Sequence, residues 1–156
     1  MWIYFRSKIW FVNCETMSKI VIDKTDRTPE LIIDTDNGFF SMEYDSRPED
    51  VRKFYYPILE KLKSILENIK QAGNLTYFKE KPFVFTFKLG YFNSSSAKFI
   101  LDILNIVKLF KEGGINVEVN WYYFEDEDDM KEAGEDFSEF CDVEFKYFIM
   151  VDEDDE

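Results

Sequence analysis

The chain has 156 residues, enough for one domain with a substantial core, and 46% of them are apolar, including 17 phenylalanines. Its net charge is −13, and residues 125–156 alone hold 16 acids and two bases, a local charge of −14. Nucleic acids and anionic membrane surfaces repel a chain of this charge, so neither is an expected partner, whereas a basic protein is compatible with it.

Nothing in the sequence indicates secretion or insertion into a membrane. The two cysteines have neither metal-binding nor redox spacing, which favours the cytoplasm, and no stretch reaches the roughly 18 apolar residues of a membrane span. Residues 1–16 are apolar but are interrupted by two basic residues and followed by no small-residue cleavage site. We expect translation to start at Met17, with 1–16 a misassigned extension, 17–151 a single domain and 152–156 an acidic tail.

A β-hairpin is the first predicted element. The apolar-rich runs Glu30–Asp34 and Phe39–Tyr44 flank Asn37-Gly38, a dipeptide that supplies the positive φ angles of a tight turn. Asp34 to Gly38 also has the acids of a calcium loop. Its glycine is the fifth residue rather than the sixth, so a hairpin turn is the better interpretation.

A long helix is predicted after the hairpin. Ser46 and Glu49 have the spacing of a capping box, in which the serine caps the first amides and the glutamate bonds back. Pro57 should kink this helix because it lacks a backbone donor. Apolar residues then recur with helical spacing and form a stripe that faces the core: Val51, Phe54, Tyr55, Ile58, Leu59, Leu62, Ile65, Leu66 and Ile69.

Strands and helices are predicted to alternate in the second half of the chain. In order they are a strand at Phe83–Leu89, a helix from about Ser94 to Glu112, a strand at Ile115–Phe124, an acidic helix at Asp128–Phe140 and a strand at Val143–Val151. Strands joined through helices of this length pair in parallel by right-handed crossovers. With the antiparallel hairpin before them, they predict an α/β fold, a mixed sheet flanked by helices.

The sequence contains no histidine, which removes the usual general base, the common nucleophile arrangements and most zinc sites. It has no glycine-rich phosphate loop or dinucleotide fingerprint, so no cofactor is expected. We interpret Cys141 as a half-buried residue at a helix end and the acidic run 125–129 as a solvated loop, so no metal is expected either. Carboxylates are plentiful, and a small enzyme that uses them for acid–base chemistry stays an alternative.

The segment Gly90–Ser96 is the remaining candidate site. It lies between a buried strand and an amphipathic helix, at the sheet edge where α/β proteins place functional loops. The residues themselves favour an ordinary helix start, with Asn93 as the cap and serines in the first turn. The alternative is a phosphoacceptor, because a helix N-terminus stabilises a phosphate by about 0.3–1 kcal/mol and the added charge would oppose docking of an apolar partner.

Six short motifs occur in order between Ile20 and Ile149: Thr28-Pro29-Glu30, Ser46-x-Pro48-Glu49, Tyr91-Phe92-Asn93-Ser94-Ser95-Ser96-Ala97-Lys98, Asp102-Ile103-Leu104, Trp121-Tyr122-Tyr123 and Asp128-Asp129-Met130. Their combination resembles the SiaC family of bacterial regulatory phosphoproteins. Members of that family are similar to the STAS-domain anti-sigma factor antagonists, which have a small mixed sheet flanked by helices.

The resemblance implies a partner-switching role in signal transduction rather than catalysis. A GHKL-type serine/threonine kinase phosphorylates the residue after the asparagine, a PP2C-type phosphatase removes the phosphate, and the unphosphorylated form binds an effector. In the characterised system that effector is a diguanylate cyclase, which makes cyclic di-GMP and promotes biofilm formation. The acceptor position maps onto Ser94, with Ser95 and Ser96 as less favoured acceptors. A constitutive scaffold without a switch is the second alternative. The predicted partner surface is Tyr91, Phe92, Asn93, Ser94, Ser95 and Lys98.

Overall fold

The computed structural model describes residues 19–151 and has the predicted α/β architecture. Residues 1–18 and 152–156, and with them the expected translation start and the acidic tail, lie outside the described residues. None of the described helices is long and apolar enough to cross a membrane.

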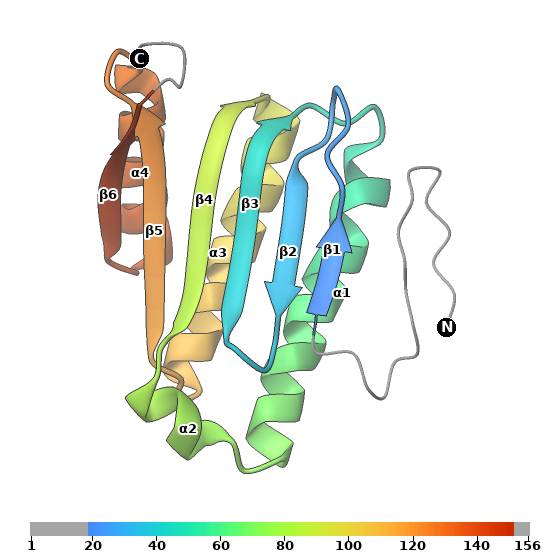
Figure 1. Ribbon diagram of the computed structural model, residues 1–156, viewed down its shortest axis with the longest axis vertical. Coiled ribbons are helices and arrows are strands. Elements are labelled where there is room, and N and C mark those ends of the chain that lie inside the picture. Colours follow the sequence, from blue (N-terminus) through green and yellow to red (C-terminus); the bar gives the residue numbers. More distant parts are fainter. Residues whose placement is uncertain (1–18, 152–156) are drawn as a thin grey trace.

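A six-stranded sheet forms one layer of the molecule, and its strands lie side by side in chain order (Figure 1). The first three strands are antiparallel, and the third to the sixth are parallel. The hairpin and the parallel pairing are therefore confirmed. The strands are β1 (Lys19–Ile22), β2 (Glu30–Asp34), β3 (Phe39–Ser46), β4 (Phe83–Phe92), β5 (Val117–Phe124) and β6 (Phe145–Met150).

The three longer helices form a second layer on one face of the sheet, and the short helix that precedes β4 lies beyond the ends of the strands (Figure 1). Each parallel strand is added on the same side of the one before it, so right-handed crossovers place the long connecting helices on the same face. Within residues 19–151 the opposite face of the sheet has no helix on it. The helices are α1 (Val51–Gln71), α2 (Leu75–Glu80), α3 (Ser94–Glu112) and α4 (Asp128–Cys141).

The core lies between the two layers. Alternate residues of β4 are fully buried phenylalanines, and Phe110 of α3 meets the rings of Phe83 and Phe85 edge-on at 5.3 and 5.4 Å. The apolar stripes of both long helices face this core as predicted, because hydrophobic burial selects the periodic face of each helix. Trp121 of β5 is also fully buried, and its indole N–H donates to the Met130 carbonyl oxygen at 2.9 Å.

The hairpin turn differs in detail from its prediction. Gly38 has a φ of 65°, but Asn37 does not share the positive φ, and the turn is closed by the Gly38 N–H donating to the Thr35 carbonyl oxygen at 3.3 Å. Asp34 accepts from the backbone and side-chain nitrogens of Asn37 at 3.1 and 2.9 Å. The carboxylate thus caps the turn, and these hydrogen bonds lower its pKa.

The capping box at Ser46 is wrong. The cap of α1 is Asp50, whose carboxylate accepts from the Lys53 N–H at 3.0 Å. The hydroxyl of Ser46 is buried and bonds elsewhere, and Glu49 forms an ion pair with Arg27 at 3.2 Å. The helix runs through Pro57 as a single element of 21 residues. The sequence analysis predicted neither β1 nor the short helix α2.

Candidate phosphorylation and partner-binding site

The serine run forms the first turn of α3, where it follows β4 directly. Asn93 is the cap residue: its backbone is extended, and its side-chain oxygen accepts from the Ser96 N–H at 2.9 Å. Its own N–H donates to the carbonyl oxygen of Ser46, the last residue of β3, at 3.1 Å. The head of the helix is therefore held against the ends of two neighbouring parallel strands.

The three serines have different environments although they are consecutive. Ser94 and Ser95 are exposed, whereas Ser96 has no exposed surface. The Ser96 hydroxyl donates to the Ser46 carbonyl oxygen at 3.0 Å and accepts from the Ser46 hydroxyl at 2.9 Å. A second protein can therefore reach the hydroxyls of Ser94 and Ser95. The Ser96 hydroxyl instead takes part in a buried hydrogen-bond network.

The buried network continues into α1. The Tyr55 hydroxyl lies 2.5 Å from the Ser46 hydroxyl, and since Ser46 donates onward to Ser96, Tyr55 is the donor in this pair. The Tyr55 ring stacks on Phe99 of α3, with centroids 5.3 Å apart. Burial raises the pKa of Tyr55 to about 12, against the smaller opposing effect of its hydrogen bonds. The chain of hydroxyls therefore stays protonated and links α1, β3 and α3.

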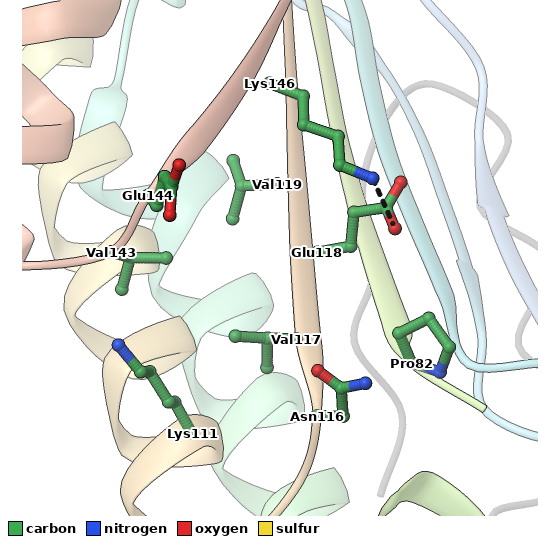
Figure 2. A pocket seen from close by; sticks show the side chains of 9 residues that line it. All are labelled: Pro82, Lys111, Asn116, Val117, Glu118, Val119, Val143, Glu144 and Lys146. Atoms are coloured by element: carbon green, nitrogen blue, oxygen red, sulfur yellow. Dashed lines mark ion pairs between the residues drawn. The ribbon is translucent and has the colours of Figure 1, made fainter. Parts of the chain in front are cut away.

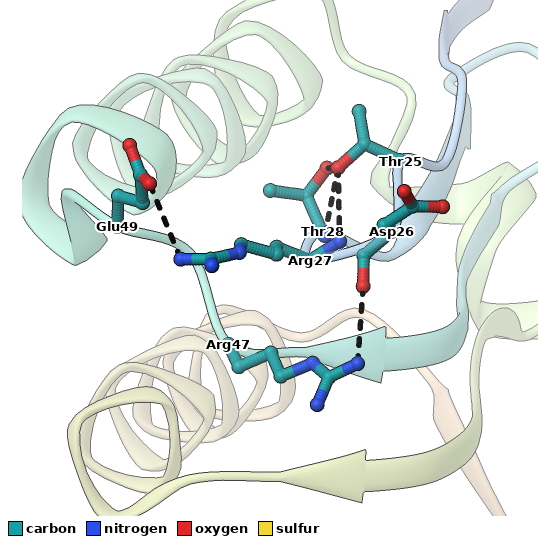
Figure 3. Close-up of polar contacts among 6 residues, drawn as sticks. All are labelled: Thr25, Asp26, Arg27, Thr28, Arg47 and Glu49. Atoms are coloured by element: carbon teal, nitrogen blue, oxygen red, sulfur yellow. Dashed lines mark hydrogen bonds and ion pairs between the residues drawn. The ribbon is translucent and has the colours of Figure 1, made fainter.

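Two arginines lie near the end of β3, the strand whose last carbonyl oxygen accepts from the cap residue of α3 (Figure 3). Arg47 directly follows the residue whose carbonyl binds the helix cap, and its guanidinium donates to the Asp26 carbonyl oxygen at 3.4 Å. Its N–H donates to the Arg27 carbonyl oxygen at 2.8 Å, and Arg27 in turn pairs with Glu49. Both arginines are exposed. The loop before β2 is thereby fastened to the segment that enters α1, and it contributes positive charge to this end of the sheet.

The other predicted surface residues are divided between solvent and core. Tyr91 is 50% exposed and Lys98 is also exposed, so both are accessible to a partner. Phe92 is only partly exposed, and its ring packs against Trp121 and Phe137 at centroid distances of 6.4 and 5.9 Å. Phe92 therefore positions the strand end more than it presents a contact surface.

Sequence reasoning missed an exposed aromatic residue on the neighbouring strand. Tyr44 has a φ of 75° and sits at a β-bulge where β3 and β4 shift register, and the Lys24 amine lies 4.0 Å above its ring. A positive φ on a tyrosine costs about 1–3 kcal/mol, a strain that is common at binding surfaces. Tyr44 pairs with Leu89 and Asp45 with Tyr91, so Gly90 is the extra residue of the bulge, and a Cβ atom on it would come within 2.9 Å of the Asp45 carboxylate. In the sequence, Gly90 within a strand pattern was the feature that could have indicated this bulge.

Cys141 and the acidic run after β5 have the following environments in the structure. Cys141 is fully buried at the end of α4, and burial raises the pKa of its thiol, so it is a poor nucleophile. Asp128 and Asp129 lie in the first turn of α4, where acids are favoured by the helix dipole. Across residues 19–151, no three acids or cysteines are grouped so as to hold a metal ion.

A pocket of about 410 Å³ lies at the opposite end of the sheet from Ser94, beside the starts of β5 and β6 (Figure 2). Two acids from separate elements line it, as the carboxylate enzyme would require. The Glu118 carboxylate forms an ion pair with the Lys146 amine at 3.2 Å. The second acid is Glu144. The lining residues are Pro82, Lys111, Asn116, Val117, Glu118, Val119, Val143, Glu144 and Lys146.

Comparison with known proteins identifies relatives over almost the whole described chain. Residues 22–150 match the family described as SiaC family regulatory phosphoprotein. An uncharacterized protein of Pseudomonas aeruginosa strain UCBPP-PA14 is 28% identical over 129 residues, which are 83% of this chain and 94% of that protein.

Solved structures are similar to the whole fold. The crystal structure of apo-SiaC from Pseudomonas aeruginosa has a TM-score of 0.69 at 28% identity, covering 84% of this chain and 98% of that chain. A chain in the crystal structure of the diguanylate cyclase SiaD in complex with its activator SiaC, from the same organism, has a TM-score of 0.72 at 26% identity and covers 84% and 99%.

Proposed function

The chain belongs to the SiaC family of regulatory phosphoproteins, and we propose that it is a cytoplasmic binding protein controlled by phosphorylation of Ser94. In this proposal a GHKL-type kinase adds the phosphate and a PP2C-type phosphatase removes it. The unphosphorylated form binds and regulates a protein effector, for which a diguanylate cyclase is the leading candidate because a similar chain activates one. The protein itself has no catalytic role.

The observation that carries the proposal is the contrast between exposed Ser94 and buried Ser96. A kinase must bring the acceptor oxygen to the γ-phosphate of ATP, so it needs a hydroxyl that is free of buried hydrogen bonds. Ser94 meets this condition and is the first residue of α3, directly after the asparagine cap. Ser95 is also exposed but lies one residue further from the cap, a position that the family motif does not mark.

A phosphate on Ser94 would act locally. It adds a charge of about −1.5 to −2 at a helix N-terminus, which stabilises it by about 0.3–1 kcal/mol, and the guanidinium of Arg47 lies at the same end of the sheet. Refolding is therefore not required. The same charge would have to be desolvated when a partner covers exposed residues such as Tyr91 and Lys98, and this cost opposes binding.

Phosphosite mapping tests the acceptor. The protein is incubated with ATP and a GHKL-type serine kinase from the same genome, and phosphopeptides are identified by mass spectrometry. We expect a single phosphate on Ser94, lost in Ser94→Ala and retained in the matched control Ser95→Ala. Label that survives Ser94→Ala would refute the assignment.

Calorimetry with the candidate cyclase tests the switch. Ser94→Asp places one negative charge at the proposed site, and we expect the Kd to rise at least about tenfold, or 1.4 kcal/mol. Ser95→Asp adds the same charge one residue away and should weaken binding less. Equal affinity for the phosphorylated and unphosphorylated protein would support the constitutive scaffold instead.

A further inference from the structure

The last strand of the sheet, β6, is an edge strand with an apolar sequence. It pairs with β5 on one side, and no other described segment of the chain pairs with its outer side (Figure 1). Its outer edge thus presents backbone N–H and C=O groups in the pattern that another strand can pair with.

The edge lacks the protection that most sheets have. Natural edge strands are usually interrupted by proline or carry charges, lysine above all. In β6 the only charged residue is Lys146, near its start, and the following run Tyr147–Val151 is uncharged. Phe148 is 39% exposed and Ile149 is 53% exposed, one on each face of the sheet, so apolar surface flanks the free backbone edge on both sides.

Acidic residues surround this edge. Residues 125–151 hold 11 acids and two bases, and every aspartate and glutamate among them is exposed. The loop that begins at Glu125 follows the end of β5, where Phe124 pairs with Met150 of β6. On the helix side, burial raises the pKa of the Tyr147 hydroxyl, and the negative charge of Glu135 adds to that rise against the opposing hydrogen bond with Ser138.

The charge selects the kind of partner. A second copy of this chain would bring its own acidic α4 and loop to the same edge, and the two would repel each other. A nucleic acid would be repelled for the same reason. A basic protein segment is attracted, and an extended one also satisfies the free backbone groups and covers the apolar side chains.

We propose that β6 is a docking edge for an extended, basic segment of a partner protein, which adds to the sheet as a seventh strand. Alternating apolar and basic residues fit it best, because the apolar ones cover Phe148 while the basic ones meet the surrounding carboxylates. The edge lies at the far side of the sheet from the β2–β3 hairpin and does not include Ser94. It therefore operates independently of the phosphorylation proposed above.

A designed peptide tests the edge without knowledge of the natural partner. The probe has about ten residues of alternating lysine and valine, long enough to span an ordinary strand, with a fluorescent label for anisotropy measurements. Two further peptides are controls: one alternates glutamate and valine, and one has proline at two central positions. The full-length protein is compared with Phe148→Lys, which puts a charge on the edge, and with Phe148→Thr, which keeps the preference for strand.

Val21→Lys is the matched variant, because Val21 has the same 39% exposure on the edge strand β1 at the other end of the sheet. We expect the lysine–valine peptide to bind the natural sequence and Val21→Lys alike, and to lose at least about tenfold in affinity for Phe148→Lys and less for Phe148→Thr. Circular dichroism checks that the variants are folded.

Three results would overturn the proposal. Equal binding to Phe148→Lys and Val21→Lys would place the peptide elsewhere. Equal binding of the proline-containing peptide would reduce the interaction to charge attraction without strand pairing. A dimer of the natural sequence that dissociates in Phe148→Lys, seen by analytical ultracentrifugation, would make a second copy the occupant.

Discussion

Replacement of Ser96 by alanine should destabilise the fold far more than replacement of its exposed neighbours. The Ser96 hydroxyl stands in the middle of a directed chain, in which Tyr55 donates to Ser46, Ser46 donates to Ser96, and Ser96 donates to the Ser46 carbonyl oxygen. All three side chains are buried, so water cannot replace a lost partner.

The expected loss follows from counting these hydrogen bonds. Ser96→Ala removes two of them and leaves the Ser46 hydroxyl without an acceptor. At about 1 kcal/mol for each net hydrogen bond, the free energy of unfolding should fall by about 2 kcal/mol. For a protein of this size that is a Tm lower by about 4–8 °C. Ser95→Ala, one residue earlier and exposed, should change stability by less than about 0.5 kcal/mol.

Thermal unfolding followed by circular dichroism measures both variants. A double-mutant cycle with Ser46→Ala then gives the interaction free energy between Ser46 and Ser96. It should be about 0.5–3 kcal/mol because the two side chains share a hydrogen bond. The reasoning would be refuted if Ser96→Ala and Ser95→Ala melted at the same temperature, or if the effects of Ser46→Ala and Ser96→Ala were simply additive.

Two further predictions concern buried aromatic residues. Below pH 10 Tyr55 is protonated in both the folded and the unfolded chain, whereas between pH 10 and its folded pKa of about 12 only the unfolded chain ionises. Stability should therefore fall by about 2 kcal/mol over that range, measured as the urea midpoint against pH, and Tyr55→Phe should flatten the fall. At Gly134, a Cβ atom would lie 2.6 Å from the Trp121 ring, so Gly134→Ala should cost about 1–3 kcal/mol, although alanine is the better helix former. An unchanged or raised urea midpoint, read from tryptophan fluorescence, would contradict this.

The elements that could be predicted from the sequence are those with a periodic residue pattern or a regular alternation of strands and helices. The stripes on α1 and α3 recur over five turns or more, so single misleading residues do not obscure them. The parallel order of β3 to β6 follows from strands that alternate with long helices. β1 was missed because its four residues are too few to show a period, and α2 because one and a half turns give no amphipathic stripe.

Local details that depend on distant residues were not predictable. Ser46 and Asp50 are both residue types that cap helices well. Asp50 is the cap because the Ser46 hydroxyl is buried and donates to Ser96, which lies 50 residues further along the chain. The positive φ of Tyr44 likewise depends on a register shift against β4.

One distinction within the candidate site could have been drawn from the sequence. Ser96 precedes Phe99, Ile100 and Ile103 by three, four and seven residues, which places it on the buried face of α3, whereas Ser94 falls outside that pattern. Helical phase by itself thus separates the serines, provided that they are taken as part of the helix and not as a loop.

The different environments of Ser94 and Ser96 also determine what kind of switch this helix start can support. A phosphate on Ser96 would have to break the bonds to Ser46 and enter the core, so it would act by unfolding the head of α3. A phosphate on Ser94 leaves those bonds intact, and the helix N-terminus accommodates its charge. Stability and partner binding should therefore vary separately: Ser94→Asp should alter affinity at nearly constant Tm, and Ser96→Ala should lower Tm. A switch at Ser94 acts through the charge on the surface because the buried hydroxyls beneath it keep the fold unchanged.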